Sequence, residues 1–131
     1  MSTERNVRIL IVDDDPSIVK LLGRFARDLS FEAVEAMHPR EALRMASEQE
    51  IHIAVVDLHM PEMGGWELMQ SLLRLNDDIK VILITGDYCS ESAALAIKNG
   101  AYDYLWKPIA LDHLGEVLQA ARQQFLHRVE K

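Results

Sequence analysis

Aspartate residues stand at the ends of two apolar stretches of this sequence. Asp13, Asp14 and Asp15 follow one short apolar run, and Asp57 follows another. Two carboxylates roughly 4 Å apart repel by about 4 kcal/mol at an effective dielectric near 20, so such a cluster needs a counter-charge. A hard divalent cation supplies one, because Mg²⁺ binds carboxylate oxygens together with phosphate oxygens.

Two further polar residues follow later apolar runs in the same way. Thr85 ends the stretch ILIT, and Lys107 follows the stretch YDYLW and precedes Pro108. A hydroxyl donor and an ammonium are the groups that a phosphoryl group needs beside a metal ion. The residue types therefore predict a Mg²⁺-dependent phosphoryl site, provided that the fold brings these positions together.

The elements that must position these residues alternate between strand and helix. Apolar, β-branched runs predict five strands, at 7–12, 31–36, 51–56, 80–84 and 102–106. Apolar residues at helical spacing, among them Ile18, Leu21, Leu22, Phe25 and Leu29 in the first helix, predict five helices, at 16–29, 39–49, 65–75, 90–99 and 111–128. The alternation predicts an α/β domain with a doubly wound, five-stranded parallel sheet and helices on both faces.

The strand order 2-1-3-4-5 is the favoured arrangement of such a sheet, because right-handed crossovers leave few alternatives. Ligands of these sheets bind outside the carboxyl ends of the strands, where the strand order reverses. Asp13, Asp14, Asp57, Thr85 and Lys107 all follow predicted strands, so we expect them to converge on one crevice.

Length and charge limit the function classes. The chain has 131 residues, which fits one domain (1–131, with a core at about 7–125). Its 14 basic and 21 acidic residues give a net charge of -7, which argues against direct nucleic-acid binding. A single cysteine, the lack of a signal-peptide pattern and the lack of a long apolar run predict a cytoplasmic location with no membrane segment.

At this point the sequence resembles a response-regulator receiver domain of two-component signalling, which has a flavodoxin-like fold like that of the chemotaxis regulators. The acidic cluster, Asp57 with MPEMGG shortly after it, Thr85 and the Lys107-Pro108 pair each follow the expected strand in the expected order. The resemblance covers roughly residues 7 to 125. It implies that Asp57 accepts a phosphoryl group from a histidine kinase or a histidine phosphotransfer protein.

The resemblance also implies roles around Asp57. Asp13, Asp14, Asp57 and the backbone carbonyl of His59 would hold Mg²⁺, Asp14 directly and Asp13 partly through water. Lys107 would pair with Asp57 and later with the phosphoryl group. Thr85 would donate its hydroxyl to a phosphoryl oxygen, and the bond before Pro108 would be cis.

A switch is the second part of what the resemblance implies. Tyr104 would turn inward when Thr85 moves, and Trp106 shares its face of the strand because side chains alternate along a strand. That face lies between the last two predicted helices, where receivers bind an output domain, an effector or a second copy. Trp106 is either an exposed anchor for such a partner or merely covers the side of Lys98 or the last helix. His59 and Asp87 would modulate the lifetime of the phosphoryl group, without an assigned sign.

Several alternatives remain open. Asp15 precedes Pro16 at a helix start and is better explained as an N-cap than as a metal ligand. The DDD run also fits a haloacid-dehalogenase-type phosphatase, in which Asp13 would be the nucleophile. A receiver is instead a signalling switch that catalyses only its own phosphorylation and slow dephosphorylation. A pseudo-receiver that binds partners constitutively is the third alternative. The last helix could lead into an output domain.

Overall fold

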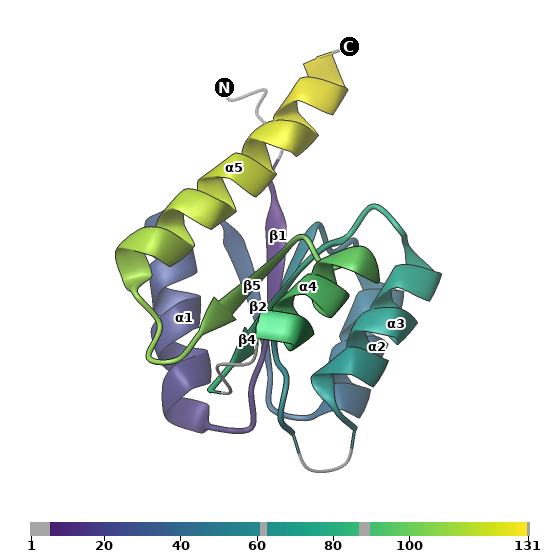
Figure 1. Ribbon diagram of the computed structural model, residues 1–131. Coiled ribbons are helices and arrows are strands. Elements are labelled where there is room, and N and C mark those ends of the chain that lie inside the picture. Colours follow the sequence, from purple (N-terminus) through teal and green to yellow (C-terminus); the bar gives the residue numbers. More distant parts are fainter. Residues whose placement is uncertain (1–5, 61–62, 87–89, 131) are drawn as a thin grey trace.

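The architecture is seen in a computed structural model that describes residues 6–60, 63–86 and 90–130 (Figure 1). Strands and helices alternate along the whole chain. The strands are β1 (Arg8–Val12), β2 (Glu32–Ala36), β3 (Ile53–Asp57), β4 (Lys80–Thr85) and β5 (Asp103–Trp106). The helices are α1 (Pro16–Asp28), α2 (Pro39–Glu48), α3 (Gly65–Leu75), α4 (Ser90–Lys98) and α5 (Leu111–Glu130).

The five strands form one parallel sheet in the order β2-β1-β3-β4-β5, as the sequence predicts. Helices α1 and α5 cover one face, and α2, α3 and α4 cover the other (Figure 1). The register sets Val12 beside Val56 and Asp57 beside Ile84. The carboxyl ends of β1, β3 and β4 therefore finish level with one another, which places the residues after them at one edge.

Two apolar layers hold the sheet between the helices. Toward α2, α3 and α4 the largest buried side chains are those of Leu10, Leu68, Met69, Leu72 and Leu83. Toward α1 and α5 they are those of Ile9, Ile11, Ile53, Ile82, Ile84, Leu114 and Leu118. Both faces of the central strands are buried, which explains why these strands read as continuous apolar runs rather than as alternating ones.

The start of α1 follows the prediction, and so does its apolar stripe except at Leu21. Asp15 is the N-cap, its carboxylate accepts from the Ser17 N–H at 2.9 Å, and Pro16 takes the first turn. The residues that α1 buries are Val19, Leu22, Gly23 and Ala26, whereas Leu21, expected on the apolar stripe, is 48% exposed. The small residues Gly23 and Ala26 are part of the buried face, and a Cβ at position 23 would overlap the Glu35 carboxylate.

Helix α5 is the longest element and extends past the end of the sheet (Figure 1). Its predicted apolar stripe is confirmed, since the residues that it buries are Leu114, Val117, Leu118, Ala121 and Phe125. Among the residues that the structure describes, no helix combines the length and the apolar character needed to cross a membrane.

Two adjacent glycines stand where the segment after β3 enters α3, and they meet very different surroundings. The Gly65 N–H donates to the Leu58 carbonyl at 2.9 Å, so the start of α3 lies directly against the end of β3. A Cβ at Gly65 would lie 2.6 Å from the Asp57 carbonyl oxygen and 2.6 Å from the Leu58 Cα. A Cβ at Gly64 would only touch the Leu58 carbonyl oxygen at 3.8 Å.

We therefore expect Gly65→Ala to lower the free energy of unfolding by about 2–3 kcal/mol, because the backbone of β3 cannot yield to the added methyl group. Gly64→Ala is the matched control and should change stability by less than about 1 kcal/mol. Urea unfolding of the two variants measures the difference. Equal stabilities would contradict the close approach of α3 to the strand end.

Candidate functional site

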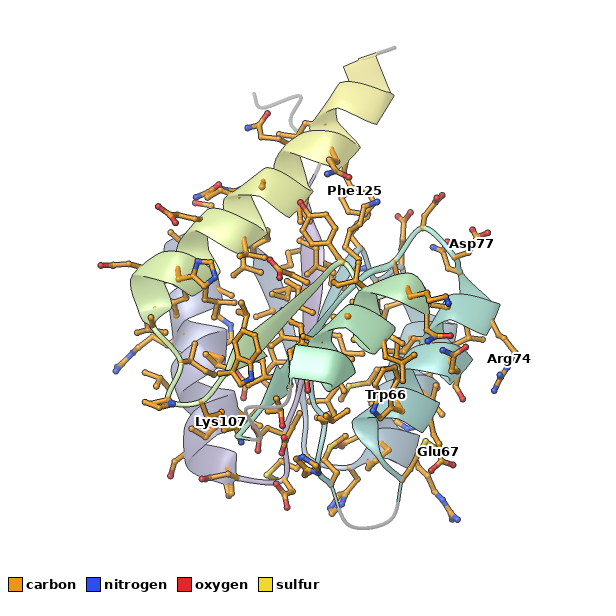
Figure 2. The ribbon with its side chains drawn as sticks, in the orientation of Figure 1. Trp66, Glu67, Arg74, Asp77, Lys107 and Phe125 are labelled. Carbon is orange, nitrogen blue, oxygen red and sulfur yellow. The ribbon has the colours of Figure 1, made fainter. Side chains whose placement is uncertain are left out.

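The predicted site residues converge at the carboxyl edge of the sheet. Asp57 and Thr85 are the last residues of β3 and β4, and Asp13 and Lys107 directly follow β1 and β5. Asp13, Asp57 and Thr85 are buried, although all three are polar. Figure 2 shows Lys107 at this edge, below the end of β5. The expected convergence of these residues is thus observed at the ends of four strands.

One ammonium group forms ion pairs with both buried carboxylates. Lys107 Nζ lies 3.4 Å from Asp13 Oδ2 and 3.7 Å from Asp57 Oδ2. The sequence-based expectation named only the contact with Asp57, so the shorter contact with Asp13 is an addition. The exposed Asp14 carboxylate contributes a third negative charge nearby, and the site carries an excess of negative charge.

Backbone N–H groups fix the orientation of both buried carboxylates. Asp13 Oδ1 accepts from the Asp15 N–H at 2.9 Å, and Asp57 Oδ1 accepts from the His59 N–H at 3.2 Å. Both contacts link an Asp side chain to the N–H two residues later, which is the Asx-turn pattern. Sequence reasoning did not name these donors, although an Asp at the end of a strand was the available signal. Each carboxylate is left with one oxygen, Oδ2, directed toward Lys107.

Burial raises the pKa of both carboxyl groups above the ordinary value of 3.8. For Asp13, the Asp15 N–H and Lys107 oppose this rise in pKa. For Asp57, the charge of Asp13 adds to the rise, and the His59 N–H and Lys107 oppose it. For the charged form of each carboxyl group, the free-energy cost of removal from water therefore exceeds the stabilisation by its hydrogen bond and by the single ammonium group.

The acidic cluster fits a divalent metal ion. Asp13, Asp14 and Asp57 each offer a carboxylate oxygen, and these oxygens all lie within 4.8 Å of one another. An oxygen-only donor set with an excess negative charge matches Mg²⁺, whereas zinc sites use nitrogen and sulfur ligands. Asp15 is engaged as the N-cap of α1, which agrees with its exclusion from the expected ligands.

The two aromatic residues of the predicted switch lie on one face of β5. Their ring centroids are 5.5 Å apart at an interplanar angle of 67°, an edge-to-face contact. Tyr104 is buried in the layer beneath α4, and Trp106 is 37% exposed. Trp106 thus presents part of its ring to solvent. The side chain of His59 is exposed, and Asp87 lies outside the described residues.

Comparison with known proteins agrees with this geometry. Residues 9–119 match the family described as the response regulator receiver domain. The chain belongs to this family. It is 35% identical over 119 residues to the transcriptional regulatory protein ZraR of Escherichia coli K12, covering 91% of the chain but 27% of that protein.

Solved receiver structures share the fold of this receiver domain. A CheY-like receiver domain protein from Methanospirillum hungatei JF-1 has a TM-score of 0.84 at 27% identity, covering 94% of this chain and 99% of the other. The beryllofluoride-activated NtrC4 receiver domain, a dimer, has a TM-score of 0.84 at 30% identity, covering 90% and 98%. The alternative of a haloacid-dehalogenase-type phosphatase is wrong, because the chain is a receiver domain of two-component systems.

The shared ammonium generates a prediction about stability. In metal-free buffer near neutral pH, we expect Asp13→Asn to raise the free energy of unfolding by about 1–2 kcal/mol, because it leaves one carboxylate for one ammonium. A pKa that is raised in the folded state means that the folded protein binds protons more readily than the unfolded chain. Stability of the parent protein is therefore gained as pH falls toward 3.8 and is lost as pH rises.

The advantage of Asp13→Asn should accordingly be smaller at about pH 5 than near neutral pH, because a raised pKa favours proton uptake by the parent carboxyls as the pH falls. Asp15→Asn is the matched control, because it removes an exposed charge and keeps a good N-cap. Thermal unfolding of both variants at the two pH values makes the comparison. A loss of stability for Asp13→Asn near neutral pH, with Asp15→Asn unchanged, would contradict the shared-ammonium account.

Proposed function

We propose that this receiver domain accepts a phosphoryl group on Asp57 and thereby switches a binding surface. The observation that carries the proposal is the pairing of Lys107 with both Asp13 and Asp57 at the meeting point of the strand ends. The donor is a phosphohistidine of a histidine kinase or a histidine phosphotransfer protein in the cytoplasm. The output domain or effector is a further partner, and the domain spans only 27% of the length of a regulator such as ZraR.

The chemistry is a nucleophilic displacement at phosphorus. A carboxylate oxygen of Asp57 forms a bond to phosphorus, the phosphorus–nitrogen bond of the phosphohistidine breaks, and the leaving imidazole keeps the electron pair and takes up a proton. Lys107 offers its ammonium to the oxygens on which charge accumulates. Thr85, buried at the end of β4, offers its hydroxyl to one of the phosphoryl oxygens.

Magnesium is the cofactor that the acidic cluster would hold. Asp13, Asp14, Asp57 and the backbone carbonyl of His59 are the proposed ligands. When bound, Mg²⁺ supplies positive charge next to the phosphoryl oxygens, which lowers the cost of bringing an anionic donor to an acidic site. The side chain of His59 and the residue Asp87 are the proposed modulators of the lifetime of the acyl phosphate.

Incubation with acetyl phosphate tests the phosphoacceptor. In the presence of Mg²⁺ we expect the protein to gain one phosphoryl group, with the acyl phosphate mapped to Asp57 by borohydride reduction and mass spectrometry. Asp57→Asn should abolish labelling, and Lys107→Met should slow it by about 10²-fold or more, since one charged stabilising group is lost. Without Mg²⁺ labelling should fall to background.

Asp15→Asn serves as the matched control for these variants, because it removes a charge next to the site without removing a proposed ligand. It should label at the rate of the parent protein. A label on Asp13 would contradict the assignment of the nucleophile. A lack of label on folded protein with Mg²⁺ would favour a constitutive pseudo-receiver.

The face that we propose to be switched is formed by α4, β5 and α5. Its helix α4 carries exposed apolar side chains, Leu95 at 52% and Ile97 at 49%, and Trp106 at 37% lies at the end of the neighbouring strand β5. A helix whose outer side is apolar gains free energy when a partner covers it. Trp106, partly exposed and held in an edge-to-face contact with Tyr104, has the character of an interface anchor.

We expect the Mg²⁺–beryllofluoride form, which mimics the phosphorylated state, to dimerise through this face. Trp106→Ser should weaken the dimer by about 10-fold or more, as expected for a truncated anchor residue. Leu75→Ser is the matched control, because Leu75 is 50% exposed at the end of α3 and outside this face. Sedimentation velocity measures both; a strict monomer at high concentration, or equal effects of the two variants, would contradict the proposal.

A further inference from the structure

A buried histidine lies at the opposite end of the sheet from the phosphoryl site. His52, 6% exposed, directly precedes β3. Its backbone N–H donates to the Arg8 carbonyl at 3.0 Å, and its carbonyl accepts from the Lys80 N–H at 2.9 Å. His52 is thus part of the hydrogen-bonded start of three adjacent strands, and it takes no part in the proposed phosphoryl chemistry.

The imidazole of His52 takes the place of one backbone acceptor between β1 and the segment that leads into β3. The Arg8 N–H donates to His52 Nδ1 at 2.9 Å. In a regular parallel pair this N–H would bond to the carbonyl of Glu50, which instead accepts from the Arg8 guanidinium at 3.0 Å. Because a backbone N–H can only donate, Nδ1 must carry a lone pair, and the ring proton belongs to Nε2.

The same ring contacts the last part of α5. The ring centroids of His52 and Phe125 are 5.2 Å apart at 71°, an edge-to-face contact. Phe125 is itself buried, and it lies where α5 leaves the sheet, at the end of the molecule opposite to Lys107 (Figure 2). His52 therefore contacts both the start of β1, through Arg8, and the C-terminal part of α5, through Phe125.

The charges around His52 come from each of the surrounding elements. The guanidinium of Arg8 on β1 is paired with Glu32 of β2 at 2.7 Å, and Lys80 of β4 lies with Nζ 6.0 Å from the centroid of the Phe125 ring. The carboxylate of Glu50 lies 3.6 Å from Nε2 but is more than half exposed, so solvent screens it. From α5, the side chain in contact is the uncharged Phe125. The neutral ring is therefore held by the hydrogen bond from the Arg8 N–H to Nδ1, not by the surrounding charges.

We propose that His52 is a proton-operated latch that holds the C-terminal part of α5 on the sheet. A proton on Nδ1 would set an N–H of the ring against the Arg8 N–H, so the hydrogen bond would be lost and the ring would have to turn. Phe125 would then lose its edge-to-face partner, and α5 would loosen beyond Leu118. The inference goes beyond phosphoryl transfer, because it gives the domain a response to acid at the end remote from Asp57.

Nuclear magnetic resonance of the parent protein tests the latch directly. We expect the imidazole nitrogen shifts of His52 to show an unprotonated Nδ1 and a protonated Nε2, and to stay so at about pH 6.5, where an exposed histidine is half charged. A protonated His52 ring at about pH 6.5, or the opposite tautomer, would overturn the proposal even if every variant failed to fold.

The variant His52→Asn tests the consequence. Its side-chain oxygen can accept from the Arg8 N–H but cannot titrate. Between about pH 7.5 and about pH 5.5 the melting temperature of the parent should fall by about 5 °C more than that of the variant. The difference between the two proteins removes the contributions of Asp13 and Asp57, which both proteins share.

Amide hydrogen exchange locates the effect on α5. Protection factors of residues 119–125 should fall in acid in the parent and stay constant in His52→Asn, whereas the matched control His113→Asn should behave like the parent. Equal pH dependence of the parent and His52→Asn in either measurement would overturn the latch.

Discussion

Two buried carboxylates share one ammonium group at the carboxyl edge of the sheet, and this interaction determines the electrostatics of the site. Asp13 and Asp57 are kept from water by the strands that carry them, and Lys107 lies within 4 Å of both. One positive charge cannot balance two, and Asp14 adds a third acid beside them. The site therefore carries uncompensated negative charge, which either a bound metal ion or the uptake of a proton can neutralise.

The rest of the fold serves to keep this arrangement in place. Parallel strands of matched register end at one level, Asx turns fix one oxygen of each carboxylate, and Gly65 allows α3 to begin against the strand that ends in Asp57. Each of these features prevents the acids from turning outward to water. The free energy needed to hold them comes from the apolar layers on both sides of the sheet.

Much of this could be predicted from the sequence because its signals are local. Apolar runs gave all five strands to within two residues at either end, and the bounds of α3 were predicted as observed. The convergence of Asp13, Asp57, Thr85 and Lys107 followed from the topology alone, since parallel strands end at a common edge. The N-cap role of Asp15 followed from its place before Pro16.

The remaining features depend on contacts between distant segments, which no local pattern encodes. On α1 the prediction placed the exposed Leu21 on the apolar stripe and missed the burial of Gly23 and Ala26, which carry little hydrophobic signal. The contact of Lys107 with Asp13 depends on how a side chain crosses the crevice. The imidazole of His52 takes its hydrogen bond from a residue 44 positions away, and the sequence offered only an isolated histidine.

The backbone beside the site adds a mechanical consequence. The Lys107 N–H donates to the Thr85 carbonyl at 2.7 Å, and Thr85 stands opposite Trp106 in the sheet. The residue that bears the hydroxyl is therefore hydrogen-bonded to the main chain of the residue that bears the ammonium, and it pairs across the sheet with the residue that bears the indole. A displacement of Thr85 at the end of β4 would have to be accommodated by the end of β5, where the outer surface of the sheet begins.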